Sequence, residues 1–319
     1  MRSRSGDRMW AVAAAAGLWG TSGLMREPLA QTLPAPTVVF YEHAVIALLL
    51  APWIVPAGRA LAGAGGRVIA AMLVIGGGSS ALATTLFTFA FAVGDPVTPQ
   101  VLQKLQPVMA VLLALVVLGE RLTPRFALYA VPALAGAWVL AFPDPLEVGV
   151  GSARAAALAL GAALLWAAGT VLGRLAGTRL SFMHITALRF TIALPVALAI
   201  AVATGSGLAI GIKALPMLVA LALLPGLLAL SLYYWGLSRT AASRATLAEL
   251  AFPLVAAVVG VAVLGAELTW SQWGGAALVL VSVTAMTLSR SRARPAGVIV
   301  PDAHRAATAA TVTGAADPR

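Results

Sequence analysis

The chain has 319 residues, of which 61% are hydrophobic and only 10% are charged, with a formal net charge of +10. A soluble protein carries roughly 25% charged residues, so this composition excludes an ordinary globular surface and favours lipid as the surrounding medium. The Lys and Arg residues lie between the apolar runs rather than in one patch, which argues against nucleic-acid binding. The absence of cysteine excludes disulfides, thiolate metal sites and a cysteine nucleophile.

Ten stretches of the sequence are mostly apolar and close to the roughly 20 residues that a helix needs to cross a bilayer. The predicted fold class is therefore an all-α integral membrane protein with about ten transmembrane helices. The first five predicted helices cover residues 10–29, 38–55, 68–91, 97–118 and 126–142. The second five cover residues 155–173, 182–203, 214–236, 245–264 and 270–288.

The two ends of the chain are predicted to lie outside the lipid. The basic segment 1–9 could introduce a signal peptide, but the small residues Ala13 to Ala16 lie inside the apolar stretch, whereas a cleavage site belongs after it. The first helix is therefore expected to remain uncleaved. Residues 290–319 are rich in Ala, Thr and Pro, which predicts a disordered tail.

The arginines between the predicted helices indicate the orientation. If the N-terminus is cytoplasmic, the loops on that side hold nearly all of the loop arginines, and the outer loops hold only Arg26, Arg154 and Lys213 as basic residues. Positive charge accumulates on the cytoplasmic side of membrane proteins. The pattern predicts a multi-pass protein of the plasma or inner membrane with both termini in the cytoplasm.

The second half of the sequence repeats motifs of the first half. Pro107 precedes Gly119 by the same distance as Pro253 precedes Gly265. An internal repeat of this kind fixes the architecture before any local detail does. Further matches pair Leu122 with Leu268, Trp19 with Trp166, Glu42 with Arg189 and Phe87 with Tyr233.

Each copy contains five predicted helices, and an odd number means that the second copy enters the membrane from the opposite side. Two inverted halves can each close one side of a shared cavity, which is the geometry of alternating access. Duplication alone could also serve only to build a stable bundle. The predicted domains are a cytoplasmic N-terminus at 1–9, a first repeat at 10–143, an outer connector at 144–154, a second repeat at 155–289 and a cytoplasmic tail at 290–319.

The repeated unit resembles a known family. The copies open with Leu18-Trp19-Gly20 and Leu165-Trp166-Ala167, and each ends with Pro, an apolar run and a Gly-Glu-x-Leu-Thr-like segment. From residue 10 to residue 288 the chain is similar to the two-module EamA transporters of the drug/metabolite transporter superfamily. The resemblance implies a secondary transporter of ten helices, often an exporter of amino acids, other small metabolites or drugs, that is driven by an ion gradient. It also implies that helices five and ten lie outside the central cavity.

Four charged residues fall inside predicted helices: Glu42, Lys104, Arg189 and Glu249. A charge in the bilayer costs a few kcal/mol, so such residues need a partner or water and are functional candidates. Glu42 departs from the family, which usually carries Arg there, whereas Arg189 keeps that residue. The prediction is two ion pairs, Glu42–Lys104 and Arg189–Glu249, one near each mouth, that bias the two access states. The same residues could instead be static struts or extend to the interface.

Two prolines are predicted to interrupt helices four and nine beside polar residues. Gln103 aligns with Glu249, and Gln106 lies three residues further along the same face. Pro107 and Pro253 follow, and proline can kink a helix because it lacks a backbone donor. Broken helices are where transporters expose polar backbone, although a purely structural kink would leave the same pattern.

Proton coupling is assigned to side chains that can titrate near neutral pH. Glu249 and Glu42 are the expected carriers, because a carboxyl group removed from water holds its proton more readily. His43 could also titrate, but a single histidine is more often packed into a core.

Three aromatic residues, Trp19, Trp166 and Tyr233, are predicted to line the cavity. Tyr234 and Trp235 lie nearer a helix end, where Trp and Tyr are commonly interfacial anchors. The candidate substrate-binding or gating residues are therefore Trp19, Glu42, Gln103, Lys104, Gln106, Trp166, Arg189, Tyr233 and Glu249.

Glycines have two expected roles. The run Gly76-Gly77-Gly78 allows close helix contact, or it could act as a hinge. Gly119 is expected to end its helix as a C-terminal cap.

Other functional classes fit the sequence less well. The histidines are His43, His184 and His304, and neither a Ser/His arrangement, metal-ligand spacing nor a phosphate-binding loop accompanies them. Nothing resembles the charged ring or carbonyl filter of a channel. A flippase for lipids or lipid-linked metabolites stays open as the alternative. We expect no catalytic residue, metal or cofactor; the expected partners are a small-molecule substrate, a proton and lipid, with a homodimer left open.

Overall fold

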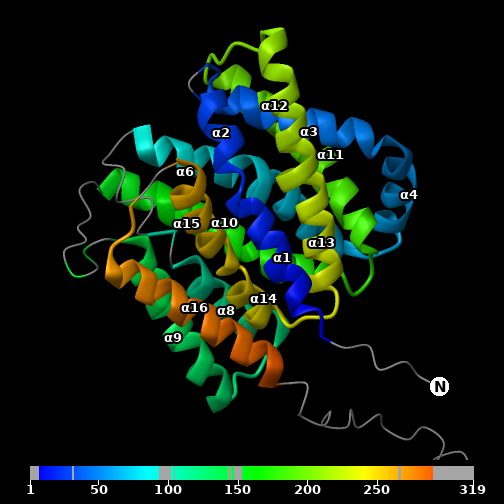
Figure 1. The fold of residues 1–319 in the computed structure, drawn as a ribbon. Helices are drawn as coiled ribbons and strands as arrows, with labels where there is room; N and C mark the ends of the chain where they lie inside the picture. Colours follow the sequence, from blue (N-terminus) through cyan, green and yellow to red (C-terminus); the bar gives the residue numbers. More distant parts are fainter. Residues whose placement is uncertain are drawn as a thin grey trace, which may run out of the picture.

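The computed structural model describes residues 7–30, 32–92, 102–103, 105–142, 144, 146, 153–264 and 267–289. Within these ranges the chain is helical and forms no strand. The helices of the first half are α1 (Met9–Gly20), α2 (Gly23–Ala30), α3 (Ala35–Leu49), α4 (Ala51–Ala62), α5 (Gly66–Leu73), α6 (Ala83–Ala92), α8 (Gln106–Leu118) and α9 (Pro124–Ala141), with the π-helical segment η1 (Val74–Leu82) between α5 and α6 (Figure 1).

The second half begins at α10 (Ala153–Ala176) and is also helical where it is described. It continues through α11 (Phe182–Ala203), the short 3-10 helix η2 (Ile212–Ala214), α12 (Leu215–Leu221), the π-helical segment η3 (Ala222–Leu228), α13 (Ala229–Leu237), α14 (Ala242–Ala248), α15 (Ala251–Leu264) and α16 (Trp270–Ser289).

The helices are those of a membrane protein. In the described part of the chain, five helical stretches are long and apolar enough to span a bilayer: Gly66–Phe87, Ala153–Ala176, Phe182–Ala203, Ile212–Leu237 and Ala242–Val263. The pair α3 and α4 would make a sixth if counted as one span. Shorter apolar helices cover Met9–Gly20, Gln106–Leu118 and Pro124–Leu140.

Besides the break between α14 and α15, two further predicted spans are divided between two helices. The stretch 10–29 is interrupted by a turn at Thr21 and Ser22, and the stretch 38–55 bends by 85° between α3 and α4. Pro52 lies in the first turn of α4 and has no N–H to continue the hydrogen-bond ladder of α3, which explains why the helix stops there. The stretch predicted as one helix at 38–55 therefore belongs to two helices.

Two π-helical segments lie at the same place in the two halves. η1 ends at Leu82 and η3 ends at Leu228, which is the same 146-residue spacing that separates Pro107 from Pro253. η1 contains three consecutive glycines, and η3 contains Pro225, which cannot donate a backbone hydrogen bond. Such π segments occur frequently at functional sites because they disturb the regular ladder.

Helices of one half pack against helices of the other half. In the first half α1 lies against α13 and α15 of the second half, and in the second half α10 lies against α6 and α8 of the first. α9 packs along α16 (Figure 1). A Cβ atom on Gly136 of α9 would come within 2.8 Å of the carbonyl oxygen of Gly275 on α16, so these two backbones touch because both positions are glycine.

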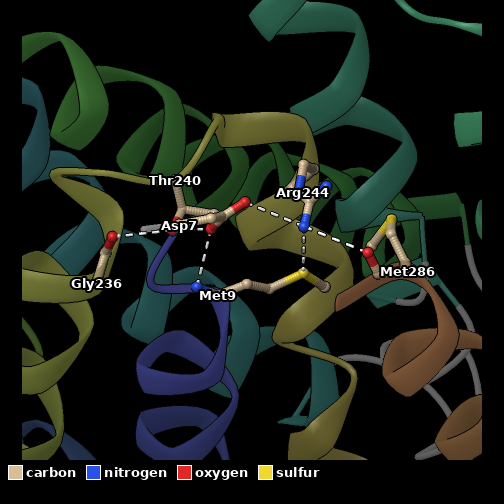
Figure 2. A network of polar contacts seen from close by, with 6 residues as sticks. All are labelled: Asp7, Met9, Gly236, Thr240, Arg244 and Met286. Carbon is tan, nitrogen blue, oxygen red and sulfur yellow. Dashed lines mark hydrogen bonds and ion pairs between the residues drawn. The ribbon is translucent and has the colours of Figure 1, made fainter. Parts of the chain in front are cut away.

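An ionic network joins the N-terminal segment to the second half (Figure 2). Asp7 Oδ2 lies 3.0 Å from Arg244 Nη2 on α14, and Asp7 Oδ1 accepts a hydrogen bond of 2.9 Å from Thr240 Oγ1. Arg244 also donates to the carbonyl oxygen of Met286 and approaches the sulfur of Met9. Arg244 is a buried residue of α14 with a carboxylate partner from the other end of the chain.

The same helix α14 is held at its start by the first half. Gly119 ends α8 in the left-handed conformation with φ 64°, which confirms its predicted role as a cap. The next residue, Glu120, accepts hydrogen bonds from the backbone N–H groups of Ala242 and Ser243 at 2.7 and 3.1 Å. The loop that follows α8 therefore supplies the N-terminal cap of a helix in the other half.

Candidate functional site

A cavity of about 720 Å³ lies between the two halves. Its walls come from α1, α3, η1, α6, α8 and α9 of the first half, and from α10, α11, η3, α13 and the α14–α15 junction of the second. Its volume lies within the roughly 300–1,000 Å³ of small-molecule sites, and its lining combines apolar walls with a few charged groups, as in such sites.

Almost all of the predicted site residues line this cavity. Lys104 lies outside the described residues, so the predicted Glu42–Lys104 pair stays a prediction. α9 contributes Leu134, Ala137 and Trp138 to the lining, which contradicts the implication that helix five stays outside the cavity. The predicted residues that line the cavity are Trp19, Glu42, His43, Gln103, Gln106, Trp166, Arg189, Tyr233 and Glu249.

Glu249 occupies the break between α14 and α15, four residues before Pro253. Its Oε1 atom accepts hydrogen bonds from Thr170 Oγ1 at 3.0 Å and from Tyr233 Oη at 2.9 Å. Its Oε2 atom accepts a hydrogen bond of 3.3 Å from Gln106 Nε2 at the start of α8. The carboxyl group is thus held by side chains from both halves of the protein.

Arg189 lies on α11 and binds two hydroxyl groups. Its Nε donates to Ser80 Oγ at 2.7 Å and its Nη1 donates to Tyr234 Oη at 2.8 Å. Among the described residues Arg189 and Glu249 form no direct ion pair; each binds its own tyrosine, and Tyr233 and Tyr234 are neighbours whose ring centroids lie 5.3 Å apart. The two charged groups are therefore connected through a pair of neighbouring tyrosines and not to each other.

The acidic and imidazole groups of α3 face the same cavity. Glu42 and His43 are each 6% exposed. His43 Nδ1 lies 2.7 Å from the carbonyl oxygen of Val39, and its ring packs against Phe190 at 5.2 Å between centroids. Glu42 Oε1 lies against the π segment η3, 3.6 Å from the position that a Cβ on Gly226 would occupy.

The aromatic residues form two related pairs across the halves. Trp19 on α1 packs against Tyr233 on α13, and Trp166 on α10 packs against Phe87 on α6, with 5.2 Å between centroids in both cases. Trp19 Nε1 also donates a 3.0 Å hydrogen bond to the carbonyl oxygen of Pro225 in η3. The repeat therefore places an equivalent aromatic pair on each side of the cavity.

The two remaining aromatic candidates lie elsewhere. Tyr234 is 1% exposed and holds Arg189, so it is not an interfacial anchor. Trp235 lies under the guanidinium of Arg8, whose carbon is 3.8 Å from the ring centroid, and it packs against Trp10.

Three residues whose hydroxyl groups belong to the site were not predicted as site residues, namely Thr170, Ser80 and Tyr234. Each is a small or amphipathic residue in an apolar helix, and such residues commonly bond to their own backbone. The available signal was asymmetry between the copies: the alignment of Trp19 with Trp166 places Gly23 opposite Thr170.

Comparison with known proteins agrees with this architecture. No curated protein matches the chain. One solved crystal structure, described only as that of a protein, is 20% identical and has a TM-score of 0.69 over 89% of this chain and 99% of its own, which indicates a shared fold. The model of the EamA-like transporter family matches the chain twice, over residues 8–142 and 153–288. The chain therefore belongs to the EamA-like transporter family.

Proposed function

We propose that this membrane protein is a secondary active transporter that moves amino acids or other small metabolites and drugs by alternating access, with protons as the coupling ion and export as the direction. The observation that carries the proposal is the position of Glu249. It sits at a helix break inside a cavity built from both halves, and both halves hydrogen-bond its carboxyl group.

Alternating access requires two halves that can exchange roles around a fixed site. The paired contacts of α1 with α13 and α15, and of α10 with α6 and α8, support such an exchange. The two π segments at equivalent positions support it further. We propose that the chain crosses the membrane ten times as two inverted five-helix repeats.

The arginine pattern supports cytoplasmic termini in a plasma or inner membrane. In that orientation the Asp7–Arg244 pair and the Glu120 cap lie at the cytoplasmic end of the bundle and close it. The cavity residues Ala35, at the start of α3, and Phe87, at the end of the apolar stretch Gly66–Phe87, lie toward the opposite end, which supports a conformation closed to the cytoplasm.

Solute counterflow in proteoliposomes tests the proposal. Vesicles loaded with an unlabelled amino acid, metabolite or drug are diluted into the labelled compound, and uptake is compared with that of empty vesicles. Transient accumulation for at least one compound supports a transporter. Lipid scrambling measured in the same vesicles, with no counterflow for any compound, would instead identify a flippase.

A further inference from the structure

Three oxygen atoms in the cavity floor form a closed triangle. Thr170 Oγ1 lies 3.0 Å from Glu249 Oε1, Tyr233 Oη lies 2.9 Å from the same atom, and the two hydroxyl oxygens lie 2.9 Å from each other. Resting on the proposed function, in which Glu249 carries the coupled proton, we infer that Thr170 is a positioning residue that holds this carboxyl group in both of its protonation states.

The triangle satisfies the ionised carboxylate. A carboxylate only accepts hydrogen bonds, and a hydroxyl group both donates and accepts. With Glu249 ionised, both hydroxyls donate to Oε1 while Gln106 donates to Oε2. Hydrogen bonds to a charged group contribute roughly twice as much as neutral ones.

The same triangle also satisfies the protonated carboxyl group. Three oxygens then carry three protons, so each oxygen donates one hydrogen bond and accepts one around the ring. Only the hydroxyl hydrogens rotate, and no heavy atom has to leave its place. A buried polar group that keeps its partners in both states avoids the cost of an unsatisfied donor or acceptor.

Comparison with the equivalent positions of the first half indicates that the hydroxyl groups of Thr170 and Tyr233 are not needed for the fold. The repeat places Gln103 opposite Glu249 and Phe87 opposite Tyr233, both at the 146-residue spacing, and it places Gly23 opposite Thr170. Gln103, Phe87 and Gly23 carry neither a carboxyl group nor a hydroxyl group. The ring therefore has no counterpart at the equivalent positions of the first half, and it accompanies Glu249.

Other charged and titratable groups reach the same region and enter the test. Arg189 on α11 lines the same cavity, and Tyr234 on α13 is the ring neighbour of Tyr233. Glu42 and His43 line the cavity from α3. Arg244, at the other end of α14, is paired with Asp7. Lys104 lies outside the described residues.

The experiment follows the proton itself and needs no substrate. The carboxylic acid C=O stretching band of the purified full-length protein is recorded by infrared difference spectroscopy across a pH series, and loss of the band in Glu249→Gln assigns it. The comparison is between wild type, Thr170→Val, which keeps the shape and removes the hydroxyl, and Thr170→Ser, which restores it.

The inference predicts that Thr170→Val moves the midpoint of the Glu249 band to alkaline pH by about one unit, because the ionised form loses more than the neutral form does. Thr170→Ser should titrate like wild type. Tyr233→Phe removes the other hydroxyl and should shift the midpoint in the same direction, which keeps the test decisive if Thr170→Val does not fold.

The matched control is Thr186→Val on α11, where a fully buried hydroxyl binds the carbonyl oxygen of Phe182 in its own helix and does not line the cavity. It should leave the midpoint unchanged. Equal midpoints for wild type, Thr170→Val and Tyr233→Phe would overturn the inference, as would an equal shift in Thr186→Val. A shift without counterflow for any solute would leave the inference standing and contradict the transporter proposal.

Discussion

Gln106 Nε2 lies 3.3 Å from Glu249 Oε2, so the N-terminal turn of α8 and the junction of α14 with α15 meet at one hydrogen bond. The two residues belong to opposite halves of the protein: Gln106 directly precedes Pro107 at the start of α8, and Glu249 lies at the break between α14 and α15, four residues before Pro253. Any movement of one half against the other must therefore change the environment of the Glu249 carboxyl group. In the proposed mechanism, this contact links protonation of Glu249 to rearrangement of the two halves.

The hydroxyl of Tyr234 holds the guanidinium of Arg189 at 2.8 Å. We expect Tyr234→Phe to lower the free energy of unfolding by about 1.5–3 kcal/mol, because a buried hydrogen bond to a charged group is lost. Unfolding in mixed micelles provides the measurement. Tyr41→Phe is the comparison, since Tyr41 donates to the neutral carbonyl of Leu208, and its loss should be smaller. Equal losses would contradict the assigned strength of the Arg189 contact.

The Asp7–Arg244 pair should contribute to the free energy of unfolding, because Arg244 is buried and needs a carboxylate partner. Asp7→Asn leaves the guanidinium of Arg244, 6% exposed, without its carboxylate, and we expect a loss of about 2 kcal/mol in the free energy of unfolding. The double variant Asp7→Asn with Arg244→Met should be less unstable than the sum of the two single variants. Arg59→Gln, on the exposed part of α4, is the control. Strict additivity would show that the pair is not coupled.

Gly275 on α16 faces the backbone of α9. A Cβ atom there would come within 2.7 Å of the Gly136 carbonyl oxygen and the Leu140 nitrogen. Gly275→Ala should therefore separate the helices and cost about 1–3 kcal/mol. The neighbouring Gly274 has no atom within 4 Å of its added Cβ, so Gly274→Ala should be tolerated. Comparable thermal stability of the two variants would contradict the observed packing.

The sequence predicted the duplicated plan and most of the cavity lining because both depend on spacing. Pro107 and Pro253 precede Gly119 and Gly265 by the same number of residues, which reveals the repeat. Charged residues in apolar membrane helices are costly in lipid and therefore usually face a cavity or a partner. Glu249, Arg189 and Gln106 were found in this way, and all three line the cavity.

The helix bend, the π segments and the side-chain partners could not be predicted, because the pattern of apolar residues along the sequence does not determine them. The bend after Leu50 and the two π segments change the backbone hydrogen bonds without changing hydropathy. The partner of Arg244 is Asp7, near the other end of the chain, and the hydroxyl partners of Glu249 come from different helices. Side-chain networks of this kind are set by tertiary packing rather than by local sequence.

The most direct test compares wild type and Glu249→Gln in reconstituted vesicles, once with equal pH on both sides and once with an imposed pH difference. We predict that wild type exchanges solute by counterflow and also accumulates it against its gradient when a pH difference is applied. Glu249→Gln should keep counterflow and lose the accumulation, whereas Glu267→Gln, at an exposed position, should behave as wild type. Accumulation by Glu249→Gln at the wild-type level would contradict the assignment of the coupled proton to this carboxyl group.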